Sequence, residues 1–375
     1  MDAEEILKKY RTVGGRVETR GKVTLKSRED FALFYTPGVG AVSTHLAGHP
    51  EDAKELSVKG NSVAVISDGS AVLGLGNIGP YGALPVMEGK ALIFKQIADI
   101  DAWPIVLDTQ DPEKIIETVL AIAPSFGGIN LEDIAAPACF EIEQRLIEKL
   151  DIPVMHDDQH GTAIVVLAGL INAAKAVGKD PKTLKVVIVG AGAAGAATAL
   201  LLVEYGTSDI IVTDRTGVIE RQRPGLDGVK KVLAEKTNSR GVAGTLRDAL
   251  RGADAVIGLS GGGKLTSEDI AAMSEAPIVF ALANPTPEIM PEDAKRAGAS
   301  VVATGRSDFP NQINNALVFP GVFRGALDKG VTKITNEMKL RAATALASLV
   351  ETPSAECIIA DVLDARVVRA IADAV

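Results

Sequence analysis

The stretch KVVIVGAGAAGAATALLL, residues 185–202, decides the fold. A run of β-branched residues, typical of a buried strand, leads directly into glycines at positions 190, 192 and 195, and a good helix former follows. This order and spacing predict a dinucleotide-binding turn, because free N–H groups at the start of the helix face a pyrophosphate. We therefore expect the cofactor to contact Gly190, Ala191, Gly192, Ala193, Ala194 and Gly195.

The residues after the next expected strand bear on which dinucleotide is bound. Asp214 closes that strand, 24 residues after Gly190, where a carboxylate can accept the ribose hydroxyls of NAD. Arg215 follows directly, with Arg221 and Arg223 nearby, and guanidinium groups there can accommodate the 2′-phosphate of NADP. The pattern slightly favours NAD and leaves dual use open.

A second glycine motif, Gly74-x-Gly76-x-x-Gly79, has the same spacing in a different context. Pro80 follows Gly79 at once, so we expect no helix to open there and no dinucleotide to bind. The preceding runs SVAVISD and SAVLGLG predict two strands around the turn Asp68-Gly69. The glycines then form a loop whose backbone approaches a ligand, and the helix behind it carries Lys90, which composition alone would leave as a surface charge.

Short apolar runs alternate with helical patterns along the whole chain, which predicts an α/β protein. The C-terminal part resembles a Rossmann-like, doubly wound parallel sheet, and the N-terminal part forms a second α/β domain. With 375 residues and 47% hydrophobic composition, two domains are expected.

Charge and cysteine content exclude several classes of partner. A net charge of -9 argues against a nucleic-acid or anionic-membrane partner. The two cysteines, Cys139 and Cys357, have no metal-type spacing and favour a reducing, cytoplasmic setting. Residues 1–15 are typical of a polar amphipathic helix rather than of a secretory leader. The most apolar helix candidate, residues 162–178, is interrupted by Asn172 and Lys175, so we expect a packed helix there and no membrane span.

Two acidic pairs follow short apolar runs: Glu132 with Asp133, and Asp157 with Asp158. Carboxylates at the carboxyl ends of strands face the ligand crevice, and three of them suit Mg²⁺ or Mn²⁺, although two solvated acidic turns fit the pattern equally well. His156 and His160 have zinc-helix spacing, but we expect a loop there and a helix only from about Thr162, which argues against zinc.

Seven motifs in order resemble the malic enzymes of the short bacterial and archaeal type, over essentially the whole chain. They are FYTPGVG (34–40), SDGSAVLGLGNIGPYGALPVMEGK (67–90), LEDIAAP (131–137), HDDQHGTA (156–163), VGAGAAG (189–195), FALANPTPEI (280–289) and ATGRSDFPNQINNALVFPG (303–321). The resemblance implies metal-dependent oxidative decarboxylation of L-malate to pyruvate and CO₂ with reduction of NAD⁺ or NADP⁺, and allows decarboxylation of oxaloacetate. It also implies a homodimer.

The resemblance assigns roles residue by residue. Tyr35 is similar to the general acid and Lys90 to the general base, which must be partly neutral to act, a state that burial beside a dication promotes. Asp157 is similar to a hydrogen-bonding partner of these proton-transfer groups. Further assignments are the metal ligands Glu132, Asp133 and Asp158, the substrate contacts Lys90, Asn284 and Asn315, and Asn284 also toward the nicotinamide.

One departure and the domain limits complete the expectations. Larger family members carry an arginine for the substrate carboxylate where this chain has Ala71 or Val72, so Lys95, backbone N–H groups or the metal must replace it. We expect a metal and substrate domain over 1–160, a nucleotide domain over 161–316, and C-terminal helices over 317–375 that pack back on the first domain. Two alternative functions are considered. A catalytically inactive nucleotide-binding module would lack Tyr35, Lys90 or a metal-binding carboxylate, and none of these is lost here. An amino-acid dehydrogenase of similar two-domain build would have no need for Glu132, Asp133 and Asp158.

Overall fold

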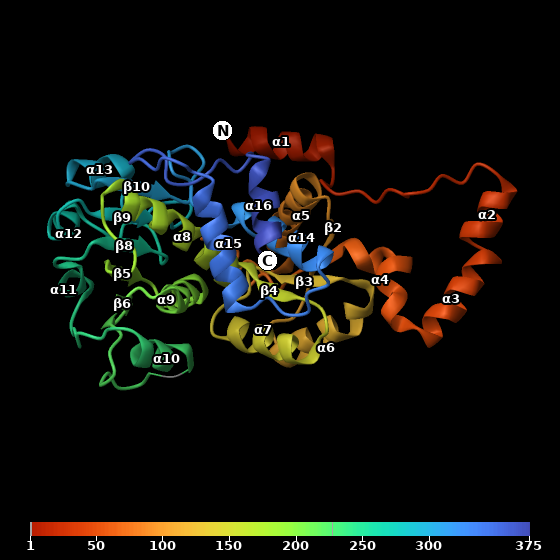
Figure 1. Ribbon diagram of the computed structural model, residues 1–375, viewed down its shortest axis with the longest axis horizontal. Helices are drawn as coiled ribbons and strands as arrows, with labels where there is room; N and C mark the ends of the chain where they lie inside the picture. Colours follow the sequence, from red (N-terminus) through yellow and green to blue (C-terminus); the bar gives the residue numbers. More distant parts are fainter. Residues whose placement is uncertain (1, 227) are drawn as a thin grey trace.

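The computed structural model describes residues 2–226 and 228–375 and contains two separate sheets (Figure 1). The first sheet has the strand order β2-β1-β3-β4 and is parallel throughout. The second has the order β10-β9-β8-β5-β6-β7 and is parallel except for β7. The strands are β1 (Ser62–Ser67), β2 (Asp101–Val106), β3 (Gly128–Leu131), β4 (Val154–His156), β5 (Lys185–Val189), β6 (Asp209–Asp214), β7 (Gly217–Val218), β8 (Ala255–Gly258), β9 (Ile278–Ala281) and β10 (Val301–Thr304).

Helices connect and cover these strands. The α-helices are α1 (Ala3–Val13), α2 (Arg28–Phe34), α3 (Gly38–Gly48), α4 (Ala53–Leu56), α5 (Gly79–Ala98), α6 (Pro112–Ile122), α7 (Ala138–Lys149), α8 (Asp157–Ala176), α9 (Ala193–Tyr205), α10 (Gly228–Lys236), α11 (Leu246–Leu250), α12 (Ser267–Ala271), α13 (Pro291–Arg296), α14 (Phe319–Asp328), α15 (Asn336–Ser348) and α16 (Arg366–Ala374). Short 3₁₀ turns lie at η1 (Pro50–Asp52), η2 (Val58–Asn61), η3 (Ala123–Ser125) and η4 (Asn315–Leu317). Within the described residues no helix is both long and apolar enough to cross a membrane.

Alternating side chains place both sheets against one shared core. On β5, Val186 and Ile188 join the large central cluster, while Val187 and Val189 face a second cluster on the other side of the sheet. On β1, Val63 and Val65 reach the same central cluster. Both sheets therefore bury a face in the centre of the molecule. The strand order of the second sheet reverses at β5, which puts a ligand crevice at the carboxyl end of that strand, as the doubly wound prediction requires.

The C-terminal helices pack between the two sheets' own helices. The ring of Phe94 on α5 lies 4.7 Å from that of Phe319 and 5.5 Å from that of Phe323, both on α14. On α8, the amide of Asn172 donates to the carbonyl of Ala347 at the end of α15, at 2.8 Å. The chain end thus contacts a helix of the first sheet and a helix that leads into the second.

Three local predictions were wrong. Residues 70–76 form no strand, only a bridge between Val72 and Gly76. Helix α5 does begin at Gly79, because a proline at the first helical turn lacks an N–H that would be unpaired there anyway. Helix α8 begins at Asp157 rather than near Thr162, so β4 leads into it without a loop.

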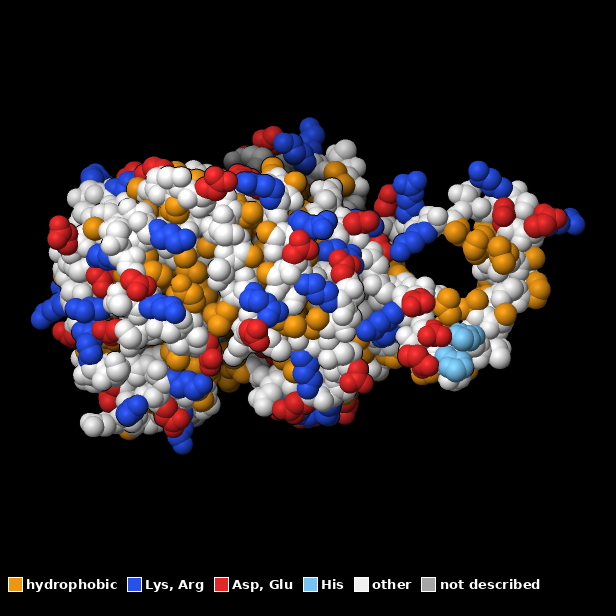
Figure 2. Space-filling view, in the orientation of Figure 1, with side chains coloured by type: hydrophobic (Ala, Val, Ile, Leu, Met, Phe, Trp, Pro, Cys, Tyr) orange, Lys and Arg blue, Asp and Glu red, His pale blue; other side chains and the backbone are white. Residues whose placement is uncertain are grey.

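The segment between α1 and β1 forms an arm that projects from the body (Figure 1). It carries α2, α3 and α4, and none of the residues of these three helices is buried. Large apolar side chains are exposed along it, among them Phe31 at 48%, Phe34 at 48% and Tyr35 at 59%. Figure 2 shows these apolar groups on the arm and an opening between the arm and the body. The arm therefore has an apolar surface that no other described part of the chain buries.

Candidate active site

A cavity of about 1140 Å³ lies where loops of the two sheets meet. Its lining from the first sheet includes Lys90, Glu132, Asp133 and Asp158. Its lining from the second includes Ala194, Ser260, Asn284 and Asn315. The fold therefore brings the expected metal ligands, the lysine and both asparagines to one place.

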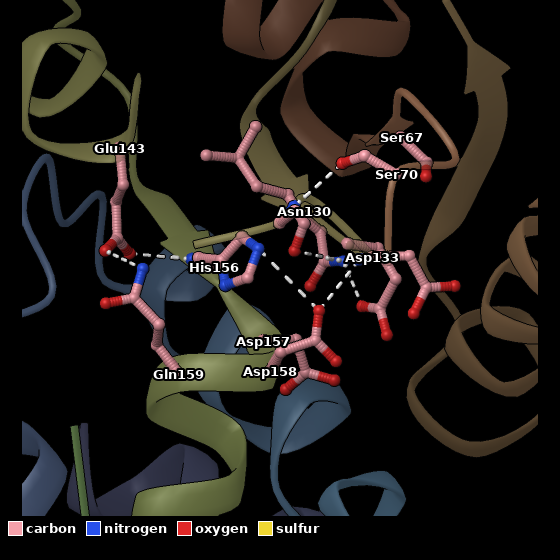
Figure 3. Close-up of polar contacts among 12 residues, drawn as sticks. Ser67, Ser70, Asn130, Asp133, Glu143, His156, Asp157, Asp158 and Gln159 are labelled. Carbon is pink, nitrogen blue, oxygen red and sulfur yellow. Dashed lines mark hydrogen bonds and ion pairs between the residues drawn. The ribbon is translucent and has the colours of Figure 1, made fainter. Parts of the chain in front are cut away.

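Three carboxylates line this cavity together, and Figure 3 shows two of them, Asp133 and Asp158. One oxygen from each of Glu132, Asp133 and Asp158 lies within 4.8 Å of the others. Glu132 and Asp133 follow β3, and Asp158 lies in the first turn of α8. Oδ2 of Asp133 is buried without a hydrogen-bond partner among the described residues. Three converging oxygens, one of them unpaired, fit a divalent cation that prefers oxygen ligands.

The loop after β1 holds this carboxylate set in place. The backbone N–H of Leu73 donates to Oδ1 of Asp133 at 3.2 Å, and the backbone N–H of Asp133 donates to Oδ2 of Asp158 at 2.7 Å. Ser70 accepts from the backbone N–H of Ala135 at 2.8 Å (Figure 3). Residues 70–76, here called the clamp loop, thus hold the acidic loop after β3 in place and do not form a strand.

Burial and mutual repulsion raise the pKa values of all three carboxyl groups. The pKa of Glu132 rises to about 7, that of Asp133 to about 8 and that of Asp158 to about 6. Desolvation is the largest cause in each case, and a neighbouring carboxylate adds to it. Ionising three buried carboxyl groups this close together is energetically unfavourable without a counter-ion, which again fits a cation site.

Lys90 lies beside these carboxylates and is 8% exposed. Its ammonium group donates to Asp157, contacts Oε1 of Glu132 at 2.9 Å and donates to Oδ1 of Asn315 at 3.2 Å. Burial alone would lower the pKa of Lys90, but Asp157, Glu132 and Asp158 outweigh it and raise this pKa. Without a bound cation, the carboxylates on several sides therefore retain the proton of Lys90; the partly neutral lysine is expected only beside a dication.

A buried network behind the site fixes the start of α8. Glu143 on α7 accepts from the backbone N–H of His156 at 2.7 Å and from the side chain of Gln159 at 3.0 Å (Figure 3). His160 Nε2 lies 3.0 Å from Glu143, and Lys339 on α15 lies 3.0 Å from His160 Nδ1. The two histidines thus serve separate contacts, and the only cluster of metal-binding groups in the part of the chain that is described is the carboxylate set.

The turn between β5 and α9 has the close backbone contacts of a nucleotide-binding turn. A Cβ atom at position 195 would stand 1.9 Å from the carbonyl oxygen of Gly190, whose φ is 114°. Among the described residues, apart from the glycine and its chain neighbours, no atom lies within 4 Å of a Cβ built at Gly192, so a ligand has room at this point of the turn. No side chain caps the N-terminus of α9, which leaves its first N–H groups for an anion. The residues present therefore fit a bound pyrophosphate.

Asp214 lies beside that turn, since the N–H of Gly190 donates to the carbonyl of Thr213 at 2.9 Å. The carboxylate of Asp214 accepts from Arg223 at 2.6 Å and from Lys230 at 2.7 Å. Arg215 is exposed, and Arg221 donates instead to the carbonyl of Glu235. Of the arginines considered from sequence, only Arg223 pairs with Asp214, and Lys230 was missed because it lies on the next helix.

Loops of the second sheet complete the cavity around Asn284. Glu288, fully buried, accepts from the backbone N–H groups of Ser260 at 3.1 Å and of Ala283 at 3.0 Å. It thereby ties the loop after β8 to the loop after β9. The motif FALANPTPEI includes this glutamate, but only the structure shows its two acceptor contacts.

Two expected residues lie outside the cavity. Tyr35 is on the projecting arm and does not line it (Figure 1). Lys95 contacts Asp99 at 2.5 Å and Asp101 at 2.9 Å on the far end of α5, so it does not replace the missing arginine. Arg16 does line the cavity and is, with Lys90, one of two cations among its described lining residues. No periodicity or motif in the sequence points to Arg16.

Comparison with known proteins agrees with this geometry. Residues 14–147 match the family described as malic enzyme, N-terminal domain, and residues 159–375 match malic enzyme, NAD binding domain. The chain is 52% identical to the bifunctional malic/malolactic enzyme of Bacillus subtilis, over 99% of this chain and 92% of that protein. It is 54% identical to the NAD-dependent malic enzyme of Geobacillus stearothermophilus (97% and 76% covered) and 49% identical to the NADP-dependent malic enzyme of Halomonas elongata (88% and 78%). A crystal structure of the NAD-dependent malic enzyme of Thermotoga maritima superposes with a TM-score of 0.95 at 49% identity, over 100% of this chain and 98% of that one.

Proposed function

The chain belongs to the malic enzyme family, and from this premise we propose a residue-level account of its activity. It is an NAD(P)-dependent enzyme that oxidatively decarboxylates malate to pyruvate and CO₂. The observation that supports the account best is the cavity that brings Lys90, the three carboxylates and Asn315 together beneath the glycine turn. The same set suits decarboxylation of oxaloacetate.

We propose that Glu132, Asp133 and Asp158 hold Mg²⁺ or Mn²⁺. The support is their convergence within 4.8 Å, the unpaired oxygen of Asp133 and the raised pKa values. When bound, the ion stabilises negative charge that develops on the substrate oxygens. Glu143 accepts from the backbone N–H of His156 and from Gln159, and so holds the first turn of α8, which carries Asp158.

Lys90 is the base that takes the hydroxyl proton of malate in this account. Asp157 and Asn315 orient its amine, and the lysine can release its proton only when the surrounding carboxylates are engaged elsewhere. Asn284 and Asn315 bind substrate, with Asn284 also toward the nicotinamide, which accepts the hydride. Arg16, the second cation of the lining, binds a substrate carboxylate in place of the family's missing arginine.

Tyr35 serves as the acid, but from a second copy of the chain. The arm exposes Phe31, Phe34 and Tyr35, and the loop after β1 and the start of α5 expose further apolar side chains, Leu75 at 62% and Tyr81 at 88%. Two patches on one chain that cannot meet each other can pair reciprocally across a two-fold axis. A homodimer of this kind covers both patches and brings each Tyr35 to the partner's cavity.

The remaining assignments complete the proposal. The glycine turn binds NAD with a slight preference over NADP. The chain divides at about residues 160 and 316, as the two sheets and the returning helices support. Because both cysteines are free, a reducing cytoplasmic setting suits the protein.

A direct assay tests the activity. The purified protein is given malate and Mn²⁺ with NAD⁺ or NADP⁺, and reduced cofactor is followed by absorbance while pyruvate and lactate are quantified. We expect reduced cofactor and pyruvate in equal amounts, and no reduction once the metal is chelated. Lactate without net reduced cofactor, or metal-independent reduction, would contradict the account.

A further inference from the structure

Glu288 carries a fully buried carboxylate that no lysine or arginine of the described chain neutralises. Its Oε1 accepts from the backbone N–H of Ser260 at 3.1 Å, and its Oε2 accepts from the backbone N–H of Ala283 at 3.0 Å. Burial raises the pKa of Glu288, and the backbone N–H groups act against this rise. A buried carboxylate without a cation partner is unusual, because removing the charge from water is costly. Its presence therefore calls for a reason beyond packing.

The two oxygens of this carboxylate serve two different loops. Ser260 lies in the loop after β8, and Ala283 lies at the start of the loop after β9. An ionised carboxylate accepts at both oxygens, whereas the amide of a glutamine accepts at one and presents N–H groups at the other. The space is equally restricted, because a Cβ atom at Gly258, the last residue of β8, would stand 2.4 Å from Cδ of Glu288. An ionised carboxylate is therefore the group that holds both loops at once.

The carboxylate holds the start of the β8 loop, whereas the main chain holds the end of this loop. The N–H groups of Gly263 and Leu265 donate to the carbonyls of Pro287 and Glu288, each at 3.1 Å. These bonds do not involve the side chain of Glu288. Loss of the carboxylate should therefore loosen the start of each loop while the remainder stays anchored.

Both loop starts lie where the nicotinamide end of a dinucleotide belongs. The second sheet has the order β9-β8-β5-β6 in its middle, the glycine turn follows β5, and Asp214 ends β6. With the pyrophosphate on the turn and the adenosine ribose beside β6, the other half of the cofactor must extend past the ends of β8 and β9. Ser260 and Ala283 line the same cavity as Lys90. The two loops therefore flank the path from the glycine turn to the catalytic lysine.

We propose that Glu288 is a positioning residue for the nicotinamide end of the cofactor. The inference rests on the proposed function, which puts the nucleotide on the turn at Gly190 and Asn284 toward the nicotinamide. Glu288 does not line the cavity, so it acts through the two loops that it holds. By fixing the N–H of Ala283 it also fixes the backbone that carries the neighbouring Asn284.

Calorimetry with two ligands tests this role without relying on turnover. The full-length wild type and Glu288→Gln are titrated with NAD⁺ and with ADP-ribose, which lacks the nicotinamide ring. We expect the affinity for NAD⁺ to fall at least about tenfold in the variant, because the loops at the nicotinamide end lose their support. The affinity for ADP-ribose should stay within about twofold of the wild-type value, because the glycine turn is intact. A general loss of structure would instead weaken both ligands alike.

Two further variants separate position from charge. Gly258→Ala keeps the charge of Glu288, but its methyl group must displace the carboxylate, so it should reproduce the selective loss of NAD⁺ affinity. Glu292→Gln is the matched control, since it removes an exposed carboxylate from the first turn of α13. It should leave both affinities unchanged. Circular dichroism and the unfolding temperature show whether each variant is folded.

The outcomes distinguish the inference from the proposed function. If ADP-ribose binds but folded Glu288→Gln keeps the wild-type affinity for NAD⁺, or weakens both ligands equally, the inference is wrong and the nucleotide site stands. A loss in Glu288→Gln that Gly258→Ala does not reproduce would indicate an effect of charge and would also overturn the positioning role. If the wild type binds neither ligand, the nucleotide site fails and the inference with it.

Discussion

The backbone at Gly74 lies so close to Asn284 that a Cβ atom on residue 74 would stand 1.7 Å from the carbonyl oxygen of Asn284. Gly74 belongs to the clamp loop after β1, and Asn284 follows β9, so this contact joins loops of the two sheets at the cavity. The glycine at position 74 of the second glycine motif therefore allows a close approach between loops of the two sheets. No side chain larger than hydrogen fits there without moving one loop.

Substituting this glycine should impair catalysis more than folding. In Gly74→Ala the added methyl group must push Asn284 or the clamp loop away, which displaces groups that position substrate. We expect kcat/KM for malate to fall at least about tenfold with little loss of helical circular dichroism. Gly48→Ala, whose new methyl group meets nothing within 4 Å, is the control and should keep wild-type kinetics.

Metal binding should strengthen as pH rises. Without metal, the raised pKa values of Glu132, Asp133 and Asp158, from about 6 to about 8, mean that protons occupy the site at pH 6 and leave it at higher pH. Mn²⁺ must displace these protons, so we expect its affinity to rise at least about tenfold from pH 6 to pH 8. Calorimetry in two buffers of different ionisation enthalpy measures both the affinity and the protons released; equal affinity at both pH values would contradict the assignment.

Removing one ligand should abolish tight metal binding. Asp158→Asn takes one anionic oxygen from the cluster, and we expect Mn²⁺ affinity to fall about 100-fold, with activity lost in parallel. Asp151→Asn, an exposed carboxylate just before β4, is the matched control. Retained Mn²⁺ affinity in Asp158→Asn would exclude this residue as a ligand.

Tyr35 and Lys90 should complement each other across the dimer. Tyr35→Phe and Lys90→Ala are each expected to be nearly inactive alone, but a hybrid dimer holds one cavity with both native residues. Mixed expression should therefore restore about a quarter of wild-type activity, because half of the dimers are hybrids and one cavity in each is intact. Sedimentation shows whether dimers form, and no recovery in confirmed hybrids would mean that Tyr35 does not act across the interface.

The buried thiol of Cys139 should make the folded protein less stable at alkaline pH. Burial, with Glu143 and Asp158 nearby, raises the pKa of this thiol from 9.0 to about 12. Since the folded chain retains a proton that the unfolded chain releases, this contribution is fully present below pH 9 and is lost as pH rises toward 12. We expect a declining free energy of unfolding over that range and a smaller decline in Cys139→Ala. In the native protein at pH 8, only exposed Cys357 should react with a thiol reagent.

Sequence patterns predicted the parts of this protein that depend on local order. The strand and glycine turn at residues 185–195 and the acidic pairs after short apolar runs could be recognised because period and spacing determine them. Pro80 and the glycines around it predict no helix start, yet α5 begins at Gly79, because a proline suits the first turn of a helix. The position of Tyr35 could not be predicted, because an exposed arm and a buried one have the same local pattern.

Charges from distant segments were the other part that sequence could not give. Lys230 meets Asp214, and Arg16 reaches the cavity from beyond α1, only through the fold. Likewise, the three carboxylates that raise the pKa of Lys90 against the effect of burial lie just after β3 and at the start of α8. Contacts between residues far apart in the sequence therefore determine the electrostatic environment of these groups.

The most direct measurement is the turnover of Lys90→Ala at saturating malate, Mn²⁺ and NAD⁺, together with its Mn²⁺ affinity. We predict that kcat falls at least about 100-fold, while Mn²⁺ still binds because all three carboxylates remain. Lys95→Ala, on the same helix but paired outside the cavity with Asp99 and Asp101, should keep wild-type kcat. Full turnover by Lys90→Ala would contradict the account.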